Sequence, residues 1–77
     1  RMTKLEEIGD SFKGVEKTYA IQAGREVRII VVPEIATDDE ANILAKSVAK
    51  RIEKEVTYPG EVKITVIRET RFTEVAR

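Results

Sequence analysis

The sequence contains no cysteine and no histidine. Without cysteine the chain cannot form disulfides, which suits a reducing compartment such as the cytosol. Without either residue it cannot build a Cys/His zinc site or pair a nucleophile with a histidine base. We therefore expect no catalytic, cofactor-binding or metal-binding residue in this chain.

The sequence also lacks net charge and long apolar runs. Lysine plus arginine and aspartate plus glutamate number 14 each, whereas a free-standing nucleic-acid binder usually has a basic excess, because phosphate neutralisation supplies much of its affinity. No apolar run approaches the roughly 18–20 residues that span a bilayer. We expect a soluble segment without direct membrane contact.

The few glycines and aromatic residues do not form a known nucleotide-binding or RNA-binding motif. Gly24 and Gly60 stand alone, so there is neither a phosphate-binding loop nor the Gly-x-x-Gly loop of a KH module. The aromatic residues are Phe12, Tyr19, Tyr58 and Phe72. None of them form the paired platform of an RRM strand.

What the chain does contain is the patterning of one small domain, covering residues 1–77. Apolar residues at helical spacing predict an N-terminal helix that ends near residue 10 or 11. The chain opens with Arg1-Met2-Thr3, almost directly inside this pattern. We expect such a beginning in a segment cut from a longer protein.

Alternating residues predict strands over 15–22 and 26–32, joined as an antiparallel hairpin by a tight reversal at Ala23-Gly24. The second strand is almost continuously apolar, which is typical of a central strand. Pro33 ends it, because proline cannot donate a ladder hydrogen bond.

Thr37-Asp38-Asp39-Glu40 has the spacing of a capping box, and it predicts a helix over 38–56. These clustered carboxylates fit helix capping better than a metal site. Tyr58-Pro59-Gly60 interrupts the helical pattern, and a third strand follows over 61–68. Residues 69–77 either extend this strand or lie over the surface.

Together these elements predict an α+β fold, a two-layer α/β sandwich in the order α-β-β-α-β. Two helices are expected on one face of a three-stranded mixed sheet, because a strand–helix–strand crossover makes the last strand parallel to the second. Both edges of so small a sheet are expected to be open.

Two sets of residues on the uncovered sheet face are candidate binding sites. The apolar residues Ile30, Val32 and Ile67 suggest a partner surface. The basic residues Arg25, Arg28 and Lys63 suggest contact with RNA phosphates. The competing interpretation is a solvated face with cross-strand ion pairs such as Glu16–Arg28.

Four segments are distinctive in combination: Phe12-Lys13-Gly14-Val15-Glu16-Lys17, Ile21-Gln22-Ala23-Gly24-Arg25-Glu26, Tyr58-Pro59-Gly60 and Val66-Ile67-Arg68-Glu69-Thr70. Together they resemble the C-terminal domain of the ribonuclease Y family. The resemblance runs over nearly the whole chain.

This resemblance implies a parent that is a bacterial endoribonuclease, initiates messenger RNA decay and is anchored to the cytoplasmic face of the membrane. The parent's anchor, coiled coil, KH domain and HD domain, with its divalent metal, are expected upstream of this segment. The resemblance implies that this chain is a non-catalytic interaction or oligomerisation module, contacting the HD domain or a second copy. The alternative is an auxiliary RNA-binding surface of the same enzyme.

Overall fold

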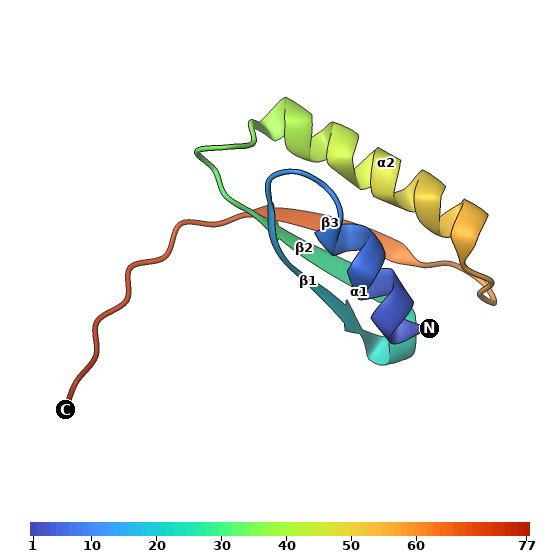
Figure 1. The fold of residues 1–77 in the computed structure, drawn as a ribbon, viewed down its shortest axis with the longest axis horizontal. Helices are drawn as coiled ribbons and strands as arrows, with labels where there is room; N and C mark the ends of the chain where they lie inside the picture. The colour runs from blue at the N-terminus through green and yellow to red at the C-terminus, as the bar shows by residue number, and fades with distance from the viewer.

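The chain folds into two helices and a three-stranded sheet, as the sequence predicts. The structure is a computed structural model that describes residues 1–77. The elements are α1 (Met2–Asp10), β1 (Val15–Ile21), the short helical turn η1 (Gln22–Gly24), β2 (Glu26–Val31), α2 (Asp38–Glu55) and β3 (Lys63–Arg68) (Figure 1). The α-β-β-α-β order and the α+β fold class are confirmed.

The sheet is mixed, with β2 in the centre. Its strand order is β1-β2-β3; β1 is antiparallel to β2, and β3 is parallel to β2. The parallel pair follows from the crossover through α2, since two strands joined by a helix in one sheet run the same way. The long apolar run of β2 is therefore explained by its two neighbouring strands and its covered face.

Both helices pack on the same face of the sheet. Alternate residues of β2, Val27, Ile29 and Val31, are each 0% exposed and face the helices. The buried cluster comprises Leu5, Ile8, Val27, Ile29, Val31, Ala36, Val48 and Ile52. Because these residues come from both helices, the central strand and, at Ala36, the loop before α2, one core holds the two layers together.

The N-terminus of α2 carries the predicted capping box. The Thr37 hydroxyl accepts a hydrogen bond from the Glu40 amide at 3.1 Å, and the Glu40 carboxylate accepts one from the Thr37 amide at 2.9 Å. These hydrogen bonds from the backbone and side chain of Thr37 lower the pKa of Glu40. Capping thus accounts for Glu40.

The chain reverses at Ala23-Gly24 as the sequence predicted and forms an antiparallel hairpin, but the turn begins one residue earlier, at Gln22. Gln22, Ala23 and Gly24 all have positive φ, at 54°, 58° and 82°. Only glycine adopts this region freely, so the first two residues are strained. The Arg1 side chain donates to the Ala23 carbonyl at 2.9 Å and holds the turn from outside.

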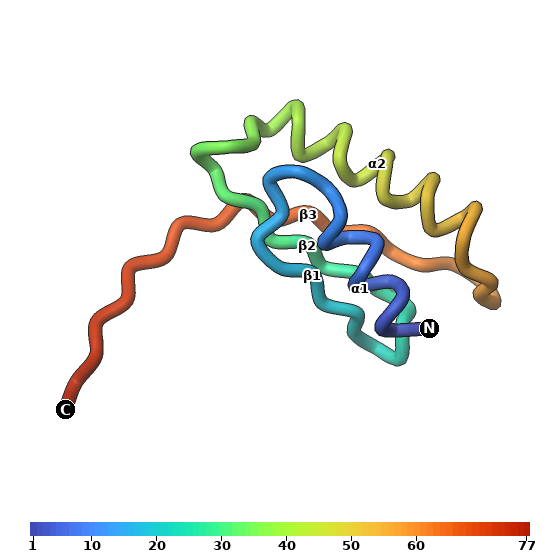
Figure 2. The backbone as a smooth tube through the Cα atoms, viewed as in Figure 1, coloured from blue at the N-terminus to red at the C-terminus, as the bar shows by residue number.

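The tail after β3 leaves the body of the molecule. Residues 69–77 form no regular element and run outward from the end of β3 (Figure 2). Phe72 is 93% exposed, and Val75 is also largely exposed. Neither predicted alternative describes the whole tail, although Arg71 turns back to pair with Glu16 on β1 at 3.2 Å.

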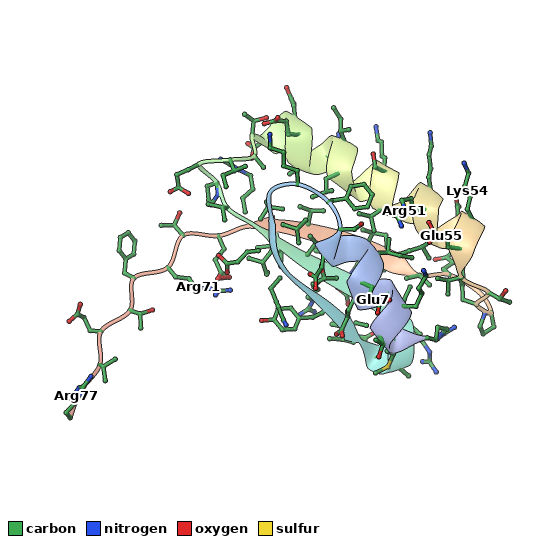
Figure 3. The ribbon with its side chains drawn as sticks, viewed as in Figure 1. Glu7, Arg51, Lys54, Glu55, Arg71 and Arg77 are labelled. Atoms are coloured by element: carbon green, nitrogen blue, oxygen red, sulfur yellow. The ribbon has the colours of Figure 1, made fainter.

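An ion-pair network joins the two helices. Glu55 on α2 lies 3.3 Å from Lys4 on α1 and 2.9 Å from Arg51. Arg51 also donates to the Ser11 hydroxyl at 2.8 Å and lies over the Phe12 ring. Figure 3 shows Arg51 and Glu55 on α2 above α1. The network fixes α1 and the residues that follow it against α2.

Candidate functional site

The candidate site is the outer face of the sheet, opposite the helices. Since Val27, Ile29 and Val31 face the core, the alternate residues of β2 and their register partners face away from it. The outer sheet face consists of Ile21, Glu26 and Lys63 in one row, Tyr19, Arg28 and Thr65 in the next, and Lys17, Ile30 and Ile67 in the third.

The structure brings together two of the three predicted partner-surface residues. Ile30 and Ile67 are register partners on β2 and β3. Ile30 is only 6% exposed, whereas Ile67 is half-buried and reachable. Val32 lies just past the end of β2, where its carbonyl accepts hydrogen bonds from Ile35 and Ala36. The accessible apolar part of the face therefore centres on Ile67.

Two of the three predicted RNA-contacting residues, Arg28 and Lys63, act on one carboxylate, that of Glu26, and the third, Arg25, contacts Lys63 through its backbone. Arg28 donates to Glu26 at 3.0 Å, and Lys63 is the register partner of Glu26. The Arg25 carbonyl accepts from the Lys63 amide at 2.9 Å. Arg25 and Lys63 are exposed, so two basic side chains remain available at this corner.

Glu26 is the one acid of the outer sheet face, and it is almost covered, at 5% exposed. Its carboxylate accepts from Arg28 and, at 3.2 Å, from the Thr65 hydroxyl. The hydrogen bond from Arg28 is the main cause of a lowered pKa of Glu26, with further contributions from Thr65 and Lys63. The carboxylate stays ionised and offsets the charge of Arg28.

The expected Glu16–Arg28 pair is wrong. A β-bulge lies between Val15 and Lys17, so Glu16 has no register partner on β2. Arg28 pairs with Glu26 in its own strand, and Glu16 pairs with Arg71. A bulge changes the register by one residue, and the alternation in the sequence does not reveal it.

Sequence reasoning missed a cationic and aromatic pair on the same face. The Lys17 ammonium lies 5.9 Å from the centre of the Tyr19 ring, and Tyr19 is 43% exposed. The i, i+2 spacing of these two residues along a strand was the available signal, because it places both on one face. Their row neighbours are Arg28 and Ile30.

No metal-binding group appears in the structure: nowhere do three or more His, Cys, Asp or Glu residues lie together so that they could hold an ion. The ligand set for the divalent metal expected in the parent is thus not met by these residues. Neither helix combines the length and the apolar character needed to cross a membrane.

Known proteins resemble this chain along its whole length. Over all 77 residues it is 60% identical to ribonuclease Y of Thermoanaerobacter pseudethanolicus, 61% identical to that of Geobacillus thermodenitrificans and 60% identical to that of Bacillus thuringiensis. The chain spans 15% of the length of each of these relatives. No family model and no solved structure matches it. The resemblance stated from the sequence is confirmed.

Proposed function

We propose that this chain is a non-catalytic interaction module of a ribonuclease Y, because all 77 of its residues match a segment of such enzymes. In this proposal the parent is a bacterial endoribonuclease that initiates messenger RNA decay, with a divalent metal in an upstream HD domain. The parent is anchored at the cytoplasmic face of the membrane, and the module itself lies in the cytoplasm. The module's partners are the HD domain of the same chain, a second copy, or both.

The observation that supports an interaction role is the apolar part of a sheet face that neither helix covers. Ile30 and Ile67 lie next to each other on this face, and Ile67 is half-buried by its neighbours alone. The partly exposed ring of Tyr19 lies one row away. Apolar side chains on an uncovered sheet face are typical of a protein–protein contact.

The test is Ile67→Lys in the full ribonuclease Y chain. We expect weaker association of the module with the rest of the enzyme, or a lower oligomeric state, together with reduced RNA cleavage. Sedimentation velocity and cleavage of a defined RNA measure the two effects. Ile67 suits this test better than Ile30, because a lysine at a position only 6% exposed would disrupt the domain itself.

The matched control is Ile43→Lys on α2. Ile43 is 62% exposed and lies on the helical layer, so this change adds the same charge away from the outer sheet face. Circular dichroism confirms that both variants fold. If Ile67→Lys leaves both assembly and cleavage as in the control, the interaction role is contradicted.

The alternative function is an auxiliary RNA contact, and the gathering of Arg25, Arg28 and Lys63 at one corner favours it. The Glu26 carboxylate opposes it, because it offsets part of the charge of Arg28 and Lys63. Titration of single-stranded RNA at several salt concentrations tests this role. If the module binds RNA, Lys63→Ala should reduce the slope of log binding constant against log salt concentration by about one, because one phosphate contact is lost. The control Lys54→Ala, at an exposed position of α2, should leave this slope unchanged.

A further inference from the structure

The two edges of the sheet differ in whether their outward-pointing backbone amides have hydrogen-bond partners. On the β1 edge, the outward-pointing amide of Ala20 donates to the Glu6 carboxylate of α1 at 3.0 Å. That edge therefore has a side chain in the place where a neighbouring strand would bind. An edge blocked in this way resists pairing with another chain.

The β3 edge has no such cover. The Lys63 amide donates to the Arg25 carbonyl on the β2 side, so the amides of Ile64 and Val66 point away from β2. No residue of the chain accepts a hydrogen bond from these two amides. They form a row of unpaired backbone groups of the kind that binds an added strand.

A groove runs along this open edge. It has a volume of about 310 Å³ and is lined by Asp38, Ala41, Asn42, Ala45, Val66 and Arg68. Its α2 wall is built largely from small side chains, and its floor includes Val66. The groove leaves room for side chains of a second layer to approach over the edge strand.

We propose that β3 pairs antiparallel with β3 of a second copy of this chain, about a two-fold axis at Val66. The proposal rests on the interaction role proposed above and names the partner of that role. A two-fold pair is the simplest closed arrangement of identical chains. The zero net charge of the sequence also means that two copies do not repel each other as whole molecules.

Charge complementarity selects this register. With the axis at Val66, Lys63 lies opposite Glu69 of the second copy, and Glu61 lies opposite Arg71 of the second copy. An axis at Thr65 instead places Glu61 opposite Glu69, and an axis at Ile67 places Lys63 opposite Arg71. Like charges directly opposite each other destabilise an antiparallel pair, so both neighbouring registers are disfavoured.

The same register gives the tail a role. Residues 69–71 would continue the hydrogen-bond ladder of β3. Arg71 would then give up its ion pair with Glu16 and form one with Glu61 of the second copy. Phe72, now 93% exposed, would lie opposite Gly60, where even an added side-chain carbon would meet no atom within 4 Å. Gly60 has a φ of 70° and lies in the bend before β3, so the ring would lie beyond the paired part of the strand.

The first test is disulfide cross-linking. The sequence has no cysteine, so any disulfide must form between the introduced residues. In Val66→Cys the two new cysteines face each other with Cα atoms about 5.5 Å apart, within disulfide range. In the control Ile64→Cys, on the same strand and face, they are about 14 Å apart, because a strand rises about 3.4 Å per residue. We expect a disulfide-linked dimer from Val66→Cys alone under mild oxidation.

The second test reverses charges and does not depend on the Val66 variant folding. Lys63→Glu and Glu69→Lys each turn two symmetry-related attractive pairs into repulsive ones, which should weaken dimerisation about tenfold. The double variant restores opposite charges and should recover most of the affinity. Sedimentation equilibrium of the 77-residue chain measures this constant.

Three results would overturn the proposal: a monomer at all concentrations, equal cross-linking through residues 64 and 66, or a dimer that the charge reversals leave unchanged. These results concern the isolated chain only. If the chain stays monomeric while Ile67→Lys still impairs the full enzyme, the interaction role stands, and the partner is another part of the enzyme. If the chain dimerises while Ile67→Lys has no effect in the enzyme, the outer sheet face is not the contact that the enzyme uses, whereas pairing through the β3 edge stands.

Discussion

Gly9 of α1 lies directly against Thr18 of β1. A side-chain carbon added to Gly9 would fall 2.4 Å from the Thr18 hydroxyl oxygen and 2.5 Å from its methyl group. Thr18 is 1% exposed, and its hydroxyl has no hydrogen-bond partner. The absence of a side chain at Gly9 therefore sets how closely the first helix approaches the sheet.

Gly9→Ala should destabilise the domain by about 1–3 kcal/mol, because the added methyl group forces α1 away from β1. Urea unfolding followed by circular dichroism measures the loss. Adding Thr18→Ala removes the two nearest atoms and should recover part of it. A double variant no more stable than Gly9→Ala alone would show that this contact is not the cause.

Thr18→Val should stabilise the domain by about 1 kcal/mol, because it replaces a buried hydroxyl that has no partner with an apolar group. The same unfolding measurement applies. Thr73→Val in the exposed tail is the control, and it should change stability little. A loss of stability at position 18 would mean that the hydroxyl finds a hydrogen bond in solution.

Arg68→Lys should lower the free energy of unfolding by about 1–2 kcal/mol, from hydrogen bonds that a lysine cannot replace. The Arg68 side chain donates to the Ala36 carbonyl at 2.8 Å and to the Pro33 carbonyl at 3.2 Å, joining the end of β3 to the loop before α2. Its third partner, Asp38, is 88% exposed. Asp38→Asn should therefore cost less than about 0.5 kcal/mol, as for an exposed ion pair.

Glu55→Gln should flatten the loss of stability in acid. The hydrogen bond from Arg51, followed by that from Lys4, lowers the pKa of Glu55 in the folded state. Its contribution is therefore complete above the ordinary glutamate pKa, and it is lost as the pH falls through the lower folded-state pKa. Denaturation curves from neutral pH to about pH 3 measure this effect.

The control for Glu55→Gln is Glu53→Gln, an exposed residue of the same helix that makes no ion pair. Glu53→Gln should leave the loss of unfolding free energy at acid pH the same as in the unmodified chain. Glu26 and Glu40, whose pKa values are also lowered, keep part of the acid dependence in every variant. If Glu55→Gln loses stability in acid as steeply as the unmodified chain, the ion-pair network between the helices does not contribute to stability as proposed.

The local elements could be predicted from the sequence because their signals are local. Thr37 and Glu40 stand at the spacing that a capping box needs, and both hydrogen bonds form. The apolar run of β2 and the crossover rule together predict the central strand and its parallel partner, and both are present. These patterns depend only on neighbours along the chain, or on the fixed hand of a crossover.

The side-chain partners of the candidate site could not be predicted in the same way. The burial of Glu26 depends on Arg28 and Thr65 lying around it, and Thr65 is far from it in the sequence. The bulge at Glu16 moved that residue away from Arg28 and towards Arg71. The hydrogen-bond partners of Arg68 come from a loop some thirty residues earlier, and no local pattern in the sequence indicates them.

The hydrogen bond between Glu6 and the Ala20 amide has a consequence for how far assembly can proceed. A sheet with two free edges can add neighbours without limit and grow into a fibre. Here the Glu6 side chain occupies the outward-pointing amide of Ala20 on the β1 edge of each copy, so a pair joined through β3 ends on both sides at an edge that carries this side chain. Growth would stop at a closed six-stranded dimer, and Glu6→Ala should make the protein prone to forming filaments.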